Sequence, residues 1–124
     1  ATTVISTDKA PAAIGPYSQA ISTGSLIFTS GQLPLKPGSK DISDNIKDQA
    51  RASLTNVRAI LEAAGSSLQK VVKTTVYLTD ISDFASVNEI YAEFFSAPFP
   101  ARSCFAVKAL PLGARVEIEV IASV

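Results

Sequence analysis

The 124-residue sequence contains no histidine and only one cysteine, Cys104. Without histidine, Ser-His-Asp and Cys-His catalytic arrangements are excluded. A metal site is disfavoured as well, because zinc and iron sites rely on imidazole or on several thiolates. One cysteine cannot form an intramolecular disulfide, which fits a reducing compartment. If the chain does chemistry, then guanidinium, carboxylate, hydroxyl and backbone groups must carry it.

The sequence also lacks an excess of either charge. Lys plus Arg number 11 and Asp plus Glu number 11, so the formal net charge is zero. The basic residues are scattered, which disfavours nucleic acid as a main partner, because neutralising phosphates needs clustered cations. No apolar run is long enough to span a membrane, and no signal-peptide pattern opens the chain. The chain begins at Ala1, which leaves open whether an initiator methionine or a targeting segment was removed, and both cytoplasm and mitochondrial matrix are expected locations.

The residues that are present predict one domain over positions 1–124. Apolar residues make up 47% of the chain and charged residues 18%, a globular composition with few charges. We expect other subunits to cover part of the surface; a well-packed monomer is the alternative.

Hydrophobic periodicity predicts six strands and two helices. The predicted strands cover residues 3–6, 18–21, 26–32, 71–79, 102–107 and 115–121. The first predicted helix starts at a cap on Ser43 or Asp44 and ends at Gly65, and the second runs from a cap at Ser82 to Ser96. Each helix has one apolar stripe, so both are expected to pack on one face of a single mixed sheet, an α+β arrangement. The predicted stripe of the first helix is Ile46, Ala50, Leu54, Val57, Leu61 and Ala64, and that of the second is Phe84, Val87, Ile90, Tyr91, Phe94 and Phe95.

The other face of this sheet is predicted to lack a cover. Alternation places one set of side chains of the 71–79 strand toward the helices, namely Val72, Thr74, Val76 and Leu78. The uncovered face carries mixed groups, namely Lys73, Thr75, Tyr77, Glu117 and Glu119. We expect this face to meet other copies of the chain in a cyclic oligomer; a solvated sheet face is the alternative.

Arg102 is the first candidate for a functional residue. It follows Pro98 and Pro100 and lies in a predominantly apolar strand, so its guanidinium is expected to be partly buried and to require a carboxylate partner. One interpretation is an internal salt bridge, because hairpin pairing around residues 108–113 would bring Arg102 opposite Glu117 or diagonal to it. The other is that Arg102 binds the carboxylate of a small substrate. Spacing alone favours the salt bridge.

Two acidic residues and one glycine are further candidates. Glu117 and Glu119 point the same way, either as a solvated strand face or, if one is sequestered at a subunit junction, as a group that orients water or moves a proton. Gly31 permits close approach of a ligand to its backbone N–H; the alternative is a β-bulge.

Three other side chains have both a functional and a structural interpretation. Tyr17 follows Gly15-Pro16 and either lines a pocket or plugs a loop against the core. Cys104 has only Arg102 nearby to lower its pKa, so a buried, inert thiol is favoured over a nucleophile. Asn88, in the second helix, is more typical of a surface residue than of a ligand.

The same residues lie in segments that resemble the RidA family, also called YjgF/YER057c/UK114. The matching segments are 12–20 (AAIGPYSQA), 29–32 (TSGQ), 72–78 (VKTTVYL), 84–88 (FASVN), 100–104 (PARSC) and 118–122 (IEVIA). The resemblance covers nearly the whole chain and implies a chorismate-mutase-like α+β fold. It also implies a homotrimer whose sheets form a central barrel, with three sites in clefts between neighbouring chains.

The resemblance further implies a hydrolase for reactive 2-imino acids, 2-iminobutanoate and 2-iminopropanoate, which become 2-keto acids and ammonia without a cofactor. By this resemblance Arg102 would hold the substrate carboxylate, assisted by the Gly31 N–H with Ser30 beside it. The Cys104 carbonyl would contact the imine nitrogen, and Glu117 would hold the attacking water. The pocket walls would be Tyr17, Phe84 and Asn88. A protonated imine is already electrophilic, so positioning and modest proton transfer suffice.

Two other functions stay open at this point. Members of the family are described as ribonucleases that inhibit translation, against which the zero net charge counts. Others are non-catalytic modules that bind small carboxylates or a protein partner, against which the joint presence of Arg102 and Glu117 counts.

Overall fold

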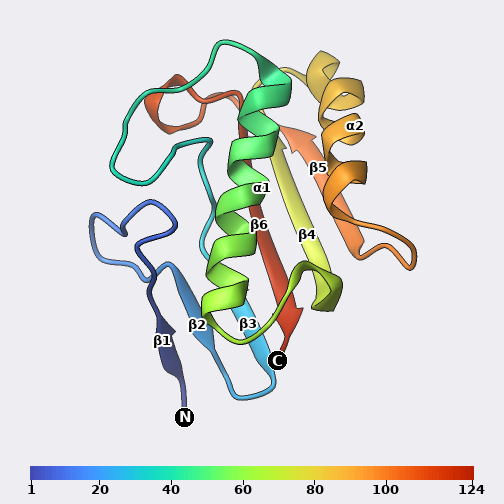
Figure 1. The fold of residues 1–124 in the computed structure, drawn as a ribbon. Helices are drawn as coiled ribbons and strands as arrows, with labels where there is room; N and C mark the ends of the chain where they lie inside the picture. Colours follow the sequence, from blue (N-terminus) through green and yellow to red (C-terminus); the bar gives the residue numbers. More distant parts are fainter.

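Two helices, α1 (Ile46–Ala63) and α2 (Phe84–Phe94), lie side by side over one six-stranded sheet in the computed structural model, which describes residues 1–124 (Figure 1). The strands are β1 (Thr3–Ile5), β2 (Ala20–Ser22), β3 (Leu26–Thr29), β4 (Val71–Leu78), β5 (Ala101–Ala106) and β6 (Val116–Ser123). Short 3₁₀ turns, η1 (Leu68–Lys70), η2 (Ile81–Asp83) and η3 (Pro111–Gly113), precede β4, α2 and β6. The strand order is β1-β2-β3-β6-β4-β5, and only the β4–β5 pair is parallel. The predicted mixed α+β sheet is confirmed.

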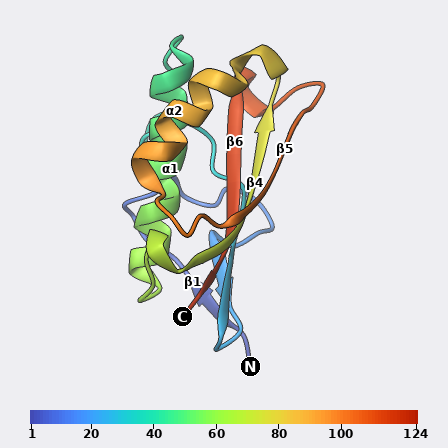
Figure 2. The same cartoon turned by 90° about the vertical axis from the view of Figure 1, so that its right-hand side faces the viewer.

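The apolar stripe of α1 forms the centre of the core. Leu54, Val57 and Leu61 are fully buried, as the periodicity predicted, and Ile60, which the predicted stripe did not include, is fully buried as well. They belong to one cluster of 20 buried residues that also includes the inward side chains of β6. Both helices contribute to this cluster and lie on the same side of the sheet (Figure 2). The other face of the sheet has no helix over it, which agrees with the prediction.

The helix ends differ slightly from the predicted ones. Asn45, rather than Ser43 or Asp44, caps α1: its side chain accepts a hydrogen bond from the Asp48 N–H at 3.1 Å. Gly65 follows the helix at φ +79°, a left-handed conformation that favours glycine and that ends α1 as predicted. Ser82 does not cap α2. It lies in η2, where the Asp80 side chain accepts a hydrogen bond from its N–H.

The predicted hairpin between the last two strands is wrong. β4 lies between β5 and β6, pairing parallel with β5 and antiparallel with β6. The physical reason is that α2 is a crossover helix, which returns the chain to start β5 in the same direction as β4. Arg102 is therefore the register partner of Thr74, and Glu117 is the partner of Tyr77.

The predicted alternation of β4 is wrong at its first residues. A register shift between Val71 and Lys73 places Val71 in the core and leaves Val72 49% exposed. After this bulge the alternation follows the prediction, and Thr74, Val76 and Leu78 are buried.

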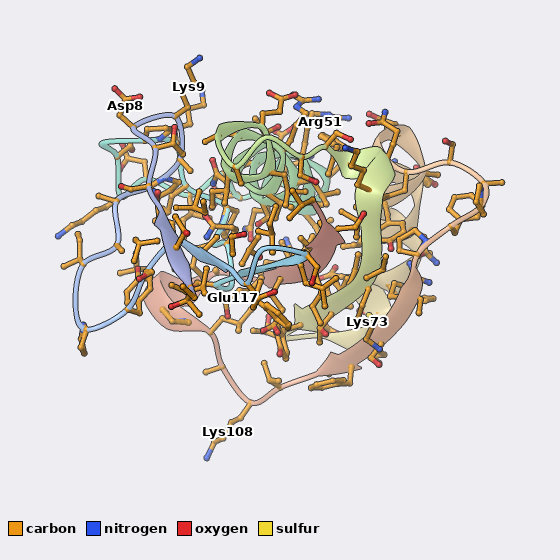
Figure 3. All side chains as sticks on the ribbon, turned by 90° about the horizontal axis from the view of Figure 1, so that it is seen from below. Asp8, Lys9, Arg51, Lys73, Lys108 and Glu117 are labelled. Carbon is orange, nitrogen blue, oxygen red and sulfur yellow. The ribbon has the colours of Figure 1, made fainter.

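The face without helices carries an apolar row and a polar cluster. Across β1, β2, β3 and β6, the register aligns one side chain from each strand, namely Val4, Ile21, Phe28 and Ile121. Beside this row, the Lys73 amine donates to the Ser103 hydroxyl at 2.9 Å. Lys73 and Glu117 both lie on the side of the sheet away from α1 (Figure 3). No helix is both long enough and apolar enough to cross a lipid bilayer.

We expect Leu54→Ala to lower the free energy of unfolding by about 2–5 kcal/mol, because Leu54 is fully buried and its truncation leaves a cavity beneath α1. Glu62→Ala, at an exposed position of the same helix, is the control and should change stability by less than about 0.5 kcal/mol. Urea unfolding followed by circular dichroism measures both. Equal losses in the two variants would show that the α1 stripe is not the core.

Candidate active site

Arg102 lies against one face of α2. Its Nη1 donates a hydrogen bond to the Asn88 Oδ1 at 2.7 Å, and its Cζ lies 5.3 Å from the centre of the Phe84 ring. Phe84 and Asn88 are four residues apart on a helix and therefore share a face. Because β5 is the edge strand on this side of the sheet, Arg102 contacts α2 but stays exposed to solvent, so the predicted partial burial of its guanidinium is wrong. The structure thus brings together three predicted site residues.

Tyr91 completes this cluster, although the sequence patterns placed it only in the apolar stripe. The Arg102 Cζ lies 4.7 Å from the centre of the Tyr91 ring, and the Tyr91 hydroxyl is 2.9 Å from the buried Thr74 hydroxyl. The signal that identifies Tyr91 is its spacing, since residues 84, 88 and 91 lie on one helix face. We refer to Phe84, Asn88, Tyr91 and Arg102 as the arginine cluster.

Arg102 forms no salt bridge within the chain. The ion pairs in the structure join other residues, and the only hydrogen bond donated by the guanidinium goes to Asn88. The internal salt bridge that spacing favoured is therefore wrong, because β4 separates Arg102 from both glutamates of β6. The remaining guanidinium N–H groups are free for an external acceptor.

Cys104 is a half-buried residue two positions after Arg102. Burial raises the pKa of its thiol, and the Arg102 charge opposes this only in part. The thiol is therefore protonated at neutral pH and is a poor nucleophile. The Val107 N–H donates to the Leu78 carbonyl, toward β4. Because backbone groups alternate in direction along a strand, the carbonyl of Cys104 points to the free edge of the sheet.

Gly31 and Glu117 form a second group of predicted residues. The Glu117 carboxyl lies over the Gly31 backbone, where an added Cβ would be only 2.8 Å from the Glu117 Cδ and Oε2. The Ser30 and Gln32 N–H groups donate to Gln19 and Ile118, whereas the Gly31 N–H between them donates to no group of the chain. We refer to Ser30, Gly31 and Glu117 as the glutamate cluster.

The Glu117 carboxyl is half-buried and accepts no hydrogen bond from the chain. Burial raises its pKa above the ordinary value of 4.5, and the nearby charge of Glu119 raises it further. Glu119, in contrast, accepts a hydrogen bond at 2.8 Å from the hydroxyl of Tyr77. Burial and this bond raise the pKa of Tyr77 to about 12. Glu117 is therefore the carboxylate that is free to bind water or accept a proton.

Ser30 attaches the loop that carries Tyr17 to the glutamate cluster. Its hydroxyl donates to the Ser18 carbonyl at 2.6 Å. The buried Gln19 side chain fixes the same loop through hydrogen bonds to backbone groups of Thr7 and Pro11, among others. The Tyr17 ring is 52% exposed, so it does not plug the core.

The two clusters face opposite sides of the sheet. Arg102 shares the inward face with its partner Thr74, whereas Glu117 shares the outward face with its partner Tyr77. Along the strands, their partners on β4 are three residues apart, which is about 10 Å. Across the sheet, β5 and β6 are two strand spacings apart, which is again about 10 Å. The two main cavities, about 690 Å³ between α1 and the 34–43 loop and about 170 Å³ near residues 94–100, contain no residue of either cluster. One chain therefore holds two parts of the predicted site without joining them.

We expect Glu117→Gln to increase the free energy of unfolding at neutral pH. A carboxyl whose pKa is raised in the folded state costs stability as pH rises through and above its ordinary value of 4.5, because folding then favours the protonated form. The gain in stability should fade below pH 4.5, where the Glu117 carboxyl is protonated in both the folded and the unfolded chain. Urea unfolding across this pH range measures the effect, with the exposed Glu62→Gln as control. A variant less stable than the parent at neutral pH would contradict the burial argument.

Three relatives share about half of their residues with this chain. A "RutC family protein y4sK" of Sinorhizobium fredii is 57% identical over 120 residues, covering 96% of this chain and 95% of that protein. The "Reactive Intermediate Deaminase A, chloroplastic" of Arabidopsis thaliana is 54% identical over 97% of this chain, which spans 65% of that longer protein. A "2-iminobutanoate/2-iminopropanoate deaminase" of Escherichia coli K12 is 50% identical, covering 95% of this chain and 94% of that protein.

Solved structures and a family model agree with these relatives. The crystal structure of E. coli TdcF with bound serine superposes with a TM-score of 0.94 at 48% identity, covering 98% of both chains. The family model described as "Endoribonuclease L-PSP" matches residues 7–124. The chain belongs to this Endoribonuclease L-PSP family, the YjgF/RidA family that its sequence motifs resemble.

Proposed function

We propose that this protein hydrolyses reactive 2-imino acids, such as 2-iminobutanoate and 2-iminopropanoate, to 2-keto acids and ammonia. The observation that carries the proposal is the Arg102 guanidinium, which has no carboxylate partner in its own chain. It is held at the sheet edge by the other members of the arginine cluster, Phe84, Asn88 and Tyr91. The names of the relatives at 50–54% identity support the same reaction.

The substrate carboxylate would bind Arg102 and the free N–H of Gly31. Charge-assisted hydrogen bonds of this kind contribute roughly 1.5–3 kcal/mol each. The Cys104 carbonyl, at the free edge of β5, would accept a hydrogen bond from the protonated imine nitrogen. These contacts fix the C=N bond relative to the attacking water, and positioning is the main requirement of this reaction.

Glu117 would act on the water. Its carboxylate accepts no hydrogen bond from the chain and is partly desolvated, and both properties favour binding a water molecule and taking a proton from it. The water oxygen adds to the carbon of the protonated imine, and one water proton passes through Glu117 to the nitrogen. The C–N bond then breaks and releases ammonia, while the Glu117 carboxylate accepts the remaining hydroxyl proton, so that the oxygen becomes the carbonyl of the 2-keto acid.

The site would require two chains. Because the two clusters face opposite sides of one sheet, a ligand can touch both Arg102 and Glu117 only where a second copy supplies one of them. The uncovered face offers the apolar row of Val4, Ile21, Phe28 and Ile121 for such contact. We therefore include in the proposal a homotrimer around a central barrel, with each cleft receiving the arginine cluster of one chain and the glutamate cluster and Tyr17 of its neighbour.

Arg102→Ala should reduce imine hydrolysis by at least about 100-fold, because it removes a charge-assisted contact to the carboxylate. The assay couples a threonine dehydratase to this protein and follows keto-acid release. Cys104→Ala is the matched control in the same strand and should retain substantial activity, since only the backbone of this residue is required. Full activity of Arg102→Ala would refute the assignment.

Mixing two inactive variants tests the shared site. When Arg102→Ala and Glu117→Gln chains are unfolded together and refolded in equal amounts, about a quarter of the clefts should combine an intact Arg102 with an intact Glu117. Recovery of about a quarter of the parent activity is the expected result. No recovery, with the oligomer reformed, would place both residues of each site in one chain.

A further inference from the structure

We propose that Tyr91 is a positioning residue for the Arg102 guanidinium, a role that goes beyond its place in the core. This inference deepens the proposed function and rests on it, since it concerns the carboxylate contact of the same site. Tyr91 would act through Arg102 and would not touch the substrate.

The geometry fixes the Tyr91 ring next to Arg102 from two directions. The guanidinium carbon lies 4.7 Å from the centre of the ring, closer than its 5.3 Å distance to the Phe84 ring. The Tyr91 hydroxyl is 2.9 Å from the hydroxyl of Thr74, which is fully buried and is the register partner of Arg102 on β4. The Tyr91 ring therefore contacts Arg102 and is also held by a hydrogen bond to Thr74, the residue beside Arg102 in the sheet.

The contacts of Arg102 orient its guanidinium and leave most of its N–H donors free to bind a ligand. Asn88 accepts one hydrogen bond from Nη1, which sets the rotation of the plane. The Phe84 and Tyr91 rings provide π-surfaces, which attract a cation without consuming its N–H donors. A carboxylate partner would occupy those donors and compete with a ligand. Aromatic contacts thus hold the arginine while they leave its remaining donors available.

Tyr91 stays neutral in this role. Burial raises the pKa of its hydroxyl, and the Thr74 bond and the Arg102 charge oppose the shift only in part. Its side chain is also 95% buried, with Phe95 packed against it at 4.6 Å between ring centres. A purely structural tyrosine would share this burial, so the test must separate core packing from an effect on Arg102.

The test compares Tyr91→Leu, Tyr91→Phe and Phe95→Leu. Tyr91→Leu removes the π-surface, and Phe95→Leu is the matched control because it makes the same kind of loss in a neighbouring ring of the same core. The ¹⁵N–¹H NMR signal of the Arg102 Nε reports its ring-current shift and rotational freedom without any ligand. The dissociation constant for 2-oxobutanoate, measured by calorimetry, reports the carboxylate contact.

We expect Tyr91→Leu to move and broaden the Arg102 signal and to weaken 2-oxobutanoate binding about tenfold, which is about 1.4 kcal/mol. Tyr91→Phe should keep binding within about threefold, because the ring remains. Phe95→Leu should leave the Arg102 signal in place. In an Arg102→Ala background, Tyr91→Leu should have no further effect on binding.

An Arg102 signal that is unchanged in Tyr91→Leu, or equally changed in Phe95→Leu, would overturn the positioning role. A parent protein that binds 2-oxobutanoate but does not accelerate imine hydrolysis would instead overturn the proposed function. The NMR comparison would still decide the role of Tyr91 in that case, because it needs neither substrate nor turnover.

Discussion

The parallel pairing of β5 with β4 is the constraint from which the rest of the site follows. A parallel pair needs a crossover, and α2 provides it on the face that also buries the core. The register that pairs Arg102 with Thr74 places the arginine under α2, where Asn88 and Tyr91 contact it. The same pairing moves β6 to the far side of β4, so Glu117 cannot neutralise Arg102. An edge strand that could have ended in a salt bridge instead presents an unpaired cation.

The two clusters handle their charge in opposite ways. Arg102 is surrounded by aromatic rings and one amide, which stabilise a cation and demand no proton. Glu117 is pressed against a backbone position without a side chain, and nothing in its chain donates to it. A guanidinium carries its charge in any protein environment, whereas the charge of Glu117 depends on pH, since burial and Glu119 both raise the pKa of its carboxyl. Fixed positive charge suits binding, and an adjustable carboxyl suits proton transfer.

Much of this could be predicted from the sequence, and the exceptions have physical causes. The α1 stripe and the strand alternation of β6 follow from period, so their buried faces were predicted correctly. The partner of β5 could not be predicted, because adjacency in sequence suggests a hairpin and pairing across a crossover leaves no local pattern. The bulge that exposes Val72 could not be predicted from the sequence either, because a β-branched residue such as valine fits both the buried and the exposed face of a strand. Tyr91 was predicted only as a core residue, because an aromatic side chain that packs in a core and one that contacts a cation look the same in a sequence. Arg102, Glu117 and Gly31 were predicted as candidates, but their separation onto opposite faces is a property of the fold alone.

The separation of Arg102 and Glu117 onto opposite faces also has a consequence for how activity depends on protein concentration. In a shared site every chain serves two clefts, one through each cluster, and an isolated chain serves none. Catalysis is then linked by mass action to assembly, so dilution below the association range removes activity without unfolding a single chain. In the proposed trimer the catalytic unit would be the contact between chains, and its concentration would rise more steeply than the concentration of the polypeptide.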